Sequence, residues 1–235
     1  IEKMEQVAEA EKDRIEEQKV EAEKEVQEQN KAIVDTSRIA ISSDRAKNNV
    51  FVAESEILKE QWGNFLCTLF DEWVRKDVGT YFIQLFDSTL ANWVGEQPGV
   101  CSLAKTCGHA GVIEFNGDVY ACDHFVFPEF KLGNLYEKTL VEMMYSERQQ
   151  TFGQDKQSKL PTQCKECEFL FACNGECPKN RFAVTADGEL GLNYLCKGYH
   201  QFFNHVAPYM DYMKRELLAE RAPANIMDAI REGKI

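Results

Sequence analysis

The stretch CKECEFLFACNGECP, residues 164–178, decides the fold of this 235-residue chain. Its four cysteines follow the spacing C-x2-C-x5-C-x3-C, and such short steps let thiolates converge on one centre without closing a long loop. Upstream, residues 101–124 read CSLAKTCGHAGVIEFNGDVYACDH and add three cysteines in the spacing C-x5-C-x14-C, and Cys196 follows downstream. The pattern predicts a cysteine-ligated metal module from Cys101 to Cys196.

The cysteines of this module make two complete sets of four, the number that a tetrahedral zinc ion or a cubane iron–sulfur cluster requires. They are Cys101, Cys107, Cys122, Cys164, Cys167, Cys173, Cys177 and Cys196. Zinc is a rival because C-x2-C is also a zinc spacing, but the run C-x2-C-x5-C-x3-C differs from a pair of C-x2-C knuckles and favours iron–sulfur. An odd total of nine cysteines without an export signal disfavours disulfides.

Charge and hydropathy exclude several other classes of protein. A net charge of -12 argues against a nucleic-acid partner and an anionic membrane surface, since both attract Lys and Arg. We expect no membrane span, because no apolar run approaches the necessary length. Residues 1–20 are charged throughout and lack the apolar core of a signal peptide. These features predict a cytoplasmic protein in a reducing compartment.

Composition divides the chain into three predicted domains, at residues 1–50, 51–100 and 101–235. The first is rich in Glu, Lys, Gln and Ala, and predicts a charged helical arm with a solvated surface. In the second, apolar residues recur at helical steps from Leu58 to Trp73, and Gly79 follows the predicted helix. The segment TYFIQLF, residues 80–86, predicts a buried strand. Ser88 would then cap a short helix that runs through Val94 and ends at Gly95.

The third domain contains a hairpin and helices. Two short β-rich runs flank Asn116-Gly117, the pair that a type I′ turn prefers. Helices are predicted over residues 135–146 and 197–206, with a further helix opened by Pro208. The fold class is therefore α+β. The ninth cysteine, Cys67, lies on the apolar side of its helix and is interpreted as a core thiol.

The cysteine motifs, together with the NGDVYA run before Cys122 and the Asp123-His124 pair after it, resemble the SPASM domain of the anaerobic sulfatase-maturating enzymes. These are radical S-adenosylmethionine enzymes, and the resemblance covers residues 54–220. It implies that residues 51–100 are the remnant of the end of a partial α/β barrel. A SPASM-type cluster-binding domain with a β-hairpin and C-terminal helices would follow. A truncated barrel would expose apolar strand edges around residues 82–86, so we expect the isolated chain to associate or to be poorly soluble.

The resemblance implies two auxiliary [4Fe–4S] clusters, with S-adenosylmethionine bound only in the complete family enzyme. One cluster would be held by Cys101, Cys107, Cys122 and Cys177, and the other by Cys164, Cys167, Cys173 and Cys196. The sharing is interleaved, because Cys177 lies in the second motif but completes the first set. Both clusters would be fully ligated by protein, so they would carry electrons and bind no substrate.

Asp123 matches the family's proposed general base, which deprotonates the target residue. A carboxylate beside an anionic cluster is expected to have a raised pKa, which suits this role. The alternative role for Asp123 is acceptance of a hydrogen bond from a nearby N–H. In the family, a Cys or Ser of a sulfatase becomes formylglycine, so the implied partners are a sulfatase polypeptide and an electron donor or acceptor protein.

One family motif is missing from these residues. The cluster that acts on S-adenosylmethionine needs C-x3-C-x2-C, and no cysteine precedes Cys67. We therefore expect no formylglycine formation by this polypeptide alone. Two alternatives stay open: a zinc-binding structural or interaction module, and a stand-alone electron-transfer protein that would not need Asp123.

Overall fold

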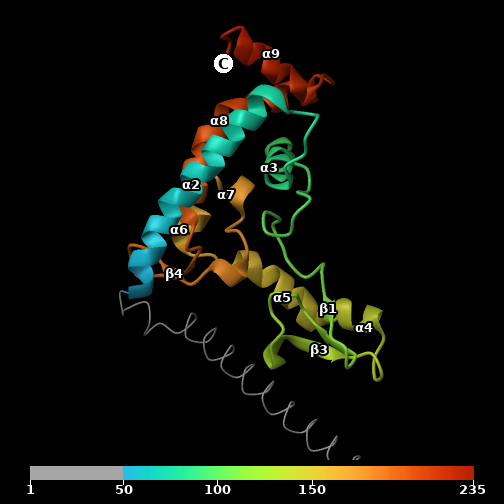
Figure 1. Ribbon diagram of the computed structural model, residues 1–235. Coiled ribbons are helices and arrows are strands. Elements are labelled where there is room, and N and C mark those ends of the chain that lie inside the picture. The colour runs from blue at the N-terminus through green and yellow to red at the C-terminus, as the bar shows by residue number, and fades with distance from the viewer. Residues whose placement is uncertain (1–49) are drawn as a thin grey trace, which may run out of the picture. The chain divides into compact units, whose positions relative to one another are not determined.

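The structure of the chain is a computed structural model that describes residues 50–235, all within one compact unit (Figure 1). The charged helical arm predicted over residues 1–50 lies outside the described residues, apart from Val50. The described part combines helices with short antiparallel strands, so the mixed helix and sheet content is confirmed. None of the described helices is long and apolar enough to cross a membrane.

The described residues form helices of two length classes, 3-10 turns and short strands. The longer helices are α2 (Val50–Lys76), α3 (Gln84–Val94), α5 (Glu147–Ser158) and α8 (Cys196–Leu218). The shorter ones are α4 (Leu140–Met144), α6 (Thr162–Lys165), α7 (Leu170–Cys173) and α9 (Ile226–Arg231), with 3-10 turns η1 (Pro128–Phe130), η2 (Pro178–Asn180) and η3 (Pro223–Asn225). The strands are β1 (Val112–Ile113), β2 (Asp118–Tyr120), β3 (Lys131–Asn134), β4 (Ala183–Val184) and β5 (Leu190–Leu192).

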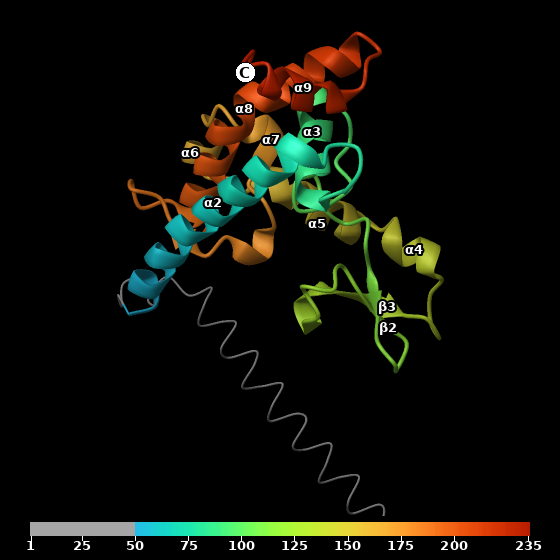
Figure 2. The same cartoon turned by 45° about the horizontal axis from the view of Figure 1, so that its top comes forward.

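A helical core forms where α2, α3 and α8 pack together, as Figures 1 and 2 show from two directions. Its centre is aromatic: the Phe70 ring contacts Phe86 edge-on at 5.2 Å between centroids, and Phe86 stacks on Phe202 at 5.6 Å. All three side chains are fully buried. The apolar periodicity of α2 therefore predicted this helix correctly. Helices from both sides of residue 100 share the core.

The strand predicted over residues 80–86 is wrong. Thr80 and Tyr81 lie in a turn that the Trp73 indole closes by donating to the Tyr81 carbonyl at 2.7 Å, and α3 begins at Gln84. The aromatic residues that suggested a strand have different environments, because Phe82 is 77% exposed whereas Phe86 is buried against Phe70. Packing of Phe86 at a helical position overrides the β propensity of the segment. The predicted helix end at Gly95 is confirmed by its left-handed φ of 86°.

The predicted break before Pro208 is also wrong, because α8 continues through this proline. Pro208 lies on the exposed face of α8, where the loss of one backbone hydrogen bond leaves groups that water can satisfy. On the opposite face Val206 and Met210 are both fully buried. Their packing holds the two halves of α8 in one register.

The hairpin around Asn116-Gly117 is confirmed, although its turn differs from type I′. β1 pairs antiparallel with β2, and β2 pairs with β3. The Gly117 N–H donates to the Glu114 carbonyl, Glu114 N–H donates to Asp118, and only Gly117 of the turn pair has a positive φ, 83°. This is a three-residue loop with the glycine in the left-handed position, the next commonest hairpin connection.

The helix predicted over residues 135–146 is shorter than expected. A capping box sets its start: Thr139 Oγ1 accepts from the Glu142 N–H at 3.2 Å, and the Glu142 carboxylate accepts from the Thr139 N–H at 2.8 Å. Ser146 then caps a second helix, α5, by accepting from the Gln149 N–H. The sequence pattern did not predict α5, because its residues ERQQTFGQDKQS lack an apolar stripe.

Candidate metal centre

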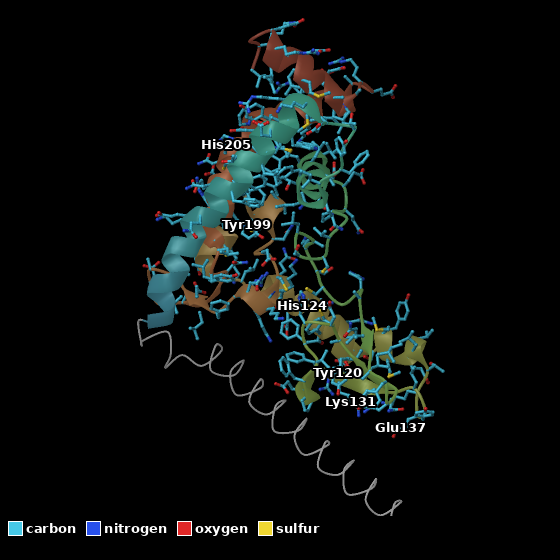
Figure 3. All side chains as sticks on the ribbon, in the orientation of Figure 1. Tyr120, His124, Lys131, Glu137, Tyr199 and His205 are labelled. Carbon is cyan, nitrogen blue, oxygen red and sulfur yellow. The ribbon has the colours of Figure 1, made fainter. Side chains whose placement is uncertain are left out.

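The first set of four cysteines lines one pocket. Cys101 lies in the turn after α3, Cys107 in the following loop, Cys122 two residues beyond β2, and Cys177 directly before η2. The same pocket is lined by His109 and His124. In Figure 3, His124 lies between the sheet that carries Tyr120 and Lys131 and the helical core that carries Tyr199. The grouping that the family resemblance implied for these four thiols is therefore also their grouping in space.

The second set lines a separate pocket, to which Gly175 also contributes. Cys164 belongs to α6, Cys167 follows it, Cys173 ends α7 and Cys196 begins α8. Phe169 and Ala172, from the same run, are buried in the helical core and anchor this site to it. A cysteine at the first position of a long helix lies at the positive end of the helix dipole, which favours negative charge.

Three consecutive left-handed residues separate the two sites. Asn174, Gly175 and Glu176 have φ values of 49°, 69° and 53°. Left-handed backbone is costly for residues with a side chain, and a run of three is rare. This turn sends Cys173 to the second pocket and Cys177 to the first. It is the local reason why one cysteine run serves both sites.

Helix α5 holds the backbone of the first site. Its buried side is polar, and Gln149, Gly153 and Lys156 lie along it at i, i+4 and i+7. The Gln149 amide donates to the carbonyls of Gly108 and Ala121, both at 3.0 Å, while the Gly153 carbonyl accepts from the Cys107 N–H at 3.1 Å. The residues next to Cys107 and Cys122 are thereby fixed by one helix.

Sequence reasoning missed this polar stripe because it searched helices for apolar periodicity. The signal that could have found it is the recurrence of Gln149, Gly153 and Lys156 at helical spacing within an otherwise charged segment. Arg181, which bonds the turn between Cys173 and Cys177, was missed as well. Its only sequence signal is its place shortly after Cys177-Pro178.

Burial and backbone hydrogen bonds act on the thiols in opposite directions. Burial raises the pKa of Cys122 to about 12 and the pKa of Cys173 to about 12. Against this, the N–H two residues further on lowers each pKa by bonding the sulfur: His124 for Cys122, Gly175 for Cys173 and Lys179 for Cys177. N–H groups aimed at sulfur stabilise thiolates, which are the form that ligates metals.

Asp123 is exposed beside Cys122, and its Oδ1 accepts from the Cys122 thiol at 3.1 Å. This bond lowers the pKa of Asp123. The raised pKa expected for Asp123 concerns a deprotonated, cluster-bound Cys122 sulfur and stays a prediction. Cys122, Asp123 and His124 also form a group whose ligand atoms lie within 4.8 Å of one another.

The remaining cysteine, Cys67, is half-buried and packs against the helical core. Burial raises its pKa, with a smaller contribution from Asp71. It lines neither of the two cysteine pockets. The interpretation of Cys67 as a core thiol is confirmed.

Residues 105–168 match the family model of SPASM, an iron–sulfur cluster-binding domain. The serine-type anaerobic sulfatase-maturating enzyme of Bacteroides thetaiotaomicron is 73% identical over 184 residues, 78% of this chain and 44% of that enzyme. The cysteine-type enzyme of Clostridium perfringens is 30% identical over 151 residues, 63% of this chain and 40% of that enzyme. The chain thus spans less than half the length of the curated relatives it matches.

Solved structures agree with these matches. Histidine-tagged anSMEcpe with bound AdoMet has a TM-score of 0.59 and 27% identity, covering 72% of this chain and 44% of that one. Native anSMEcpe with bound AdoMet and Cp18Cys peptide has a TM-score of 0.59 and 28% identity, covering 68% and 44%. Over most of its length this chain is therefore a relative of the anaerobic sulfatase-maturating enzymes of the radical S-adenosylmethionine/SPASM family, and it corresponds to a part of them.

Proposed function

We propose that the described part of this chain binds two [4Fe–4S] clusters and serves as the auxiliary-cluster part of a sulfatase-maturating oxidoreductase. The observation that carries the proposal is the sorting of eight cysteines, interleaved in sequence, into two pockets of four. In this proposal Cys101, Cys107, Cys122 and Cys177 hold one cluster, and Cys164, Cys167, Cys173 and Cys196 hold the other. Four thiolates are what each such cluster requires of a protein.

The spacing of the sulfurs supports a cluster over a single zinc ion. With Zn–S bonds of about 2.3 Å, the four sulfurs of a tetrahedral site lie about 3.8 Å apart. Among the described residues, no three cysteine sulfurs lie within 4.8 Å of one another. This spacing is compatible with a multi-atom centre, which holds its ligands further apart than one metal ion does.

The protein's own contribution is to orient and insulate the sulfurs. The N–H groups of His124, Gly175 and Lys179 bond the sulfurs of Cys122, Cys173 and Cys177 and would tune the potentials of bound clusters. A cluster with four protein ligands supplies one-electron transfer and leaves no position for substrate. Phe125 and Phe152 line the first pocket beside its cysteines and would reduce the access of water to it.

Asp123 is proposed as the general base for the target residue. Its exposure leaves it open to an incoming peptide, and it adjoins Cys122, so a proton and an electron would leave the substrate in the same neighbourhood. Once Cys122 ligates a metal it has no proton to donate. The Asp123 carboxylate then loses the bond that lowers its pKa, and its basicity rises.

Other parts of the proposal follow from the relatives. Residues 51–100 would be the end of the partial barrel and residues 101–235 the cluster-binding domain. The substrate would be a Cys or Ser in a sulfatase polypeptide, converted to formylglycine, with a separate protein exchanging electrons. Because these 235 residues contain no C-x3-C-x2-C motif, we expect the polypeptide by itself to form no formylglycine.

Metal and sulfide analysis after reconstitution without oxygen tests the proposal. We expect about eight iron and eight sulfide per chain, with a broad absorption band near ~400 nm. Cys107→Ala and Cys173→Ala should each lose about half of the iron, from different clusters, while the matched control Cys67→Ala keeps all of it. About two zinc ions without sulfide would overturn the proposal in favour of a structural zinc module.

A further inference from the structure

Lys156 is buried in α5 with its charge directed at the first site. The side chain is 1% exposed, and Nζ donates to the carbonyls of Cys101 at 2.6 Å, Ser102 at 2.8 Å and Ala104. An ammonium group has three N–H donors and no acceptor, whereas a neutral amine would turn a lone pair toward one of these oxygens. The three carbonyls therefore fit the charged form.

Arg181 lies on the turn between the two sites. Its guanidinium donates to the carbonyl of Gly175 at 2.8 Å and to those of Asn174 and Glu176, both at 3.0 Å. These are the three left-handed residues that separate Cys173 from Cys177. A further bond from Nη1 to the Lys156 carbonyl connects the turn to α5.

Neither cation has a carboxylate partner among the described residues, although buried charges are normally paired. The buried carboxylate of this region, Glu176, accepts instead from the amides of Asn180 at 2.8 Å and Asn193 at 2.7 Å. Among the described residues, the hydrogen bonds of the buried Lys156 ammonium and of the half-buried Arg181 guanidinium thus go to backbone carbonyls. A nearby anion would supply the opposite charge that these two cations lack.

The thiols provide that anion when they ligate a metal. Lys156 bonds the Cys101 carbonyl, and burial lowers its pKa while Cys107, Cys101 and Cys177, all members of the first set, act in the opposite direction. Arg181 interacts with Cys107 and Cys177 of the first set and with Cys164 and Cys173 of the second. One cation therefore serves one site, and the other serves both.

We propose that Lys156 and Arg181 are the fixed counter-charges of the two cluster sites, Lys156 raising the reduction potential at the first site and Arg181 raising it at both. This inference rests on the proposed function. Reduction adds a negative charge to a centre that is already anionic, so a nearby buried cation stabilises the reduced state more than the oxidised state. The two residues are positioning residues, since each acts through backbone carbonyls and charge without touching a substrate.

The test is a redox titration of the full chain followed by electron paramagnetic resonance, after reconstitution without oxygen. In Lys156→Met, one of the two reduction steps should move to lower potential while the other stays. In Arg181→Gln, both should move to lower potential. The matched control is Lys159→Met, directly after α5, where the exposed Lys159 pairs with Asp155 at the surface, and it should move neither step.

Iron and sulfide are measured first on the unsubstituted chain, so that the two proposals fail separately. A chain without iron would sink the proposed function, and this inference with it. Full iron content with unchanged potentials in both neutral variants would overturn this inference alone. If a neutral variant does not hold its clusters, Lys156→Arg or Arg181→Lys decides: restored clusters with the original potentials support the charge, and a continued loss of clusters refutes it.

Discussion

The helical core and the cysteine region, residues 101–196, are built on opposite principles. In the core, α2, α3 and α8 bury apolar and aromatic side chains against one another, with Phe70, Phe86 and Phe202 at the centre. In the cysteine region, the side chains that fix the fold are buried and polar: Gln149, Lys156, Glu176 and Asn193. Apolar burial stabilises a fold without any ligand, whereas polar side chains that bond backbone carbonyls chiefly specify geometry. The comparison indicates that the packing of the core requires no ligand, whereas the cysteine region is arranged around its thiols.

Replacing Phe202 by alanine should have the largest effect, because it removes an aromatic ring from the centre of the core. The ring is fully buried and lies 5.6 Å from Phe86 and 6.2 Å from Phe70. We expect the free energy of unfolding to fall by about 3–5 kcal/mol, in the metal-free chain as in the loaded one. Circular dichroism in denaturant measures it.

The control for this substitution is Phe115→Ala at the tip of the hairpin, where the side chain is 99% exposed. It should leave the unfolding midpoint within experimental error of the unsubstituted chain. The comparison fails if Phe202→Ala and Phe115→Ala both lower the free energy of unfolding of the metal-free chain by the same small amount. The core would then not be an independently packed region.

Replacing Gly153 by alanine should damage the cysteine region without damaging the core. A Cβ at this position would lie 2.5 Å from the Cys107 carbonyl oxygen, so α5 or the Cys107 loop must shift. Overpacking of this kind costs about 1–3 kcal/mol. We expect about half of the iron to be lost, from the first site, while helix content in the metal-free chain is unchanged.

The matched control is Gln154→Ala, one residue further along α5 on its exposed side. It should retain the full iron content. Loss of iron from both sites in Gly153→Ala would mean that α5 supports the second site as well. The two pockets would then form one cooperative unit.

The same contrast explains what the sequence could predict. The apolar periodicity of α2 reflects the burial of one helix face and predicted that helix correctly, and the cysteine spacing predicted a region in which thiols gather. Helix α5 was missed because its buried stripe of Gln149, Gly153 and Lys156 is polar, and its partners are backbone carbonyls that no side-chain pattern reveals. The strand expected over residues 80–86 was wrong for another reason, since Phe86 packs at a helical position against Phe202, which lies far away in the sequence.

At one end of the helical core a charged cluster replaces apolar packing, and it gives the smallest expected effect. Glu216, near the end of α8, is 7% exposed. It accepts from the Arg221 guanidinium at 2.6 Å and 2.9 Å and from the Asn225 amide at 2.7 Å. These bonds lower the pKa of Glu216 to about 2, the Arg221 bond contributing most. The cluster joins α8 to η3 and α9.

The lowered pKa of Glu216 determines how its contribution to the free energy of unfolding depends on pH. A carboxyl group whose pKa is lower in the folded chain stabilises the fold above its ordinary pKa of 4.5, and the stabilisation disappears as pH falls toward about 2. Glu216→Gln should therefore unfold more easily than the unsubstituted chain at pH 7, and this difference should shrink between pH 4.5 and pH 2. Unfolding midpoints across this pH range measure the difference.

Glu220→Gln, on an exposed side chain two residues beyond α8, is the control and should show no such trend. If the difference in unfolding midpoint stays constant with pH, Glu216 acts through shape and packing and its charge contributes nothing. Apolar packing would then account for the stability of this end of the helical core as well.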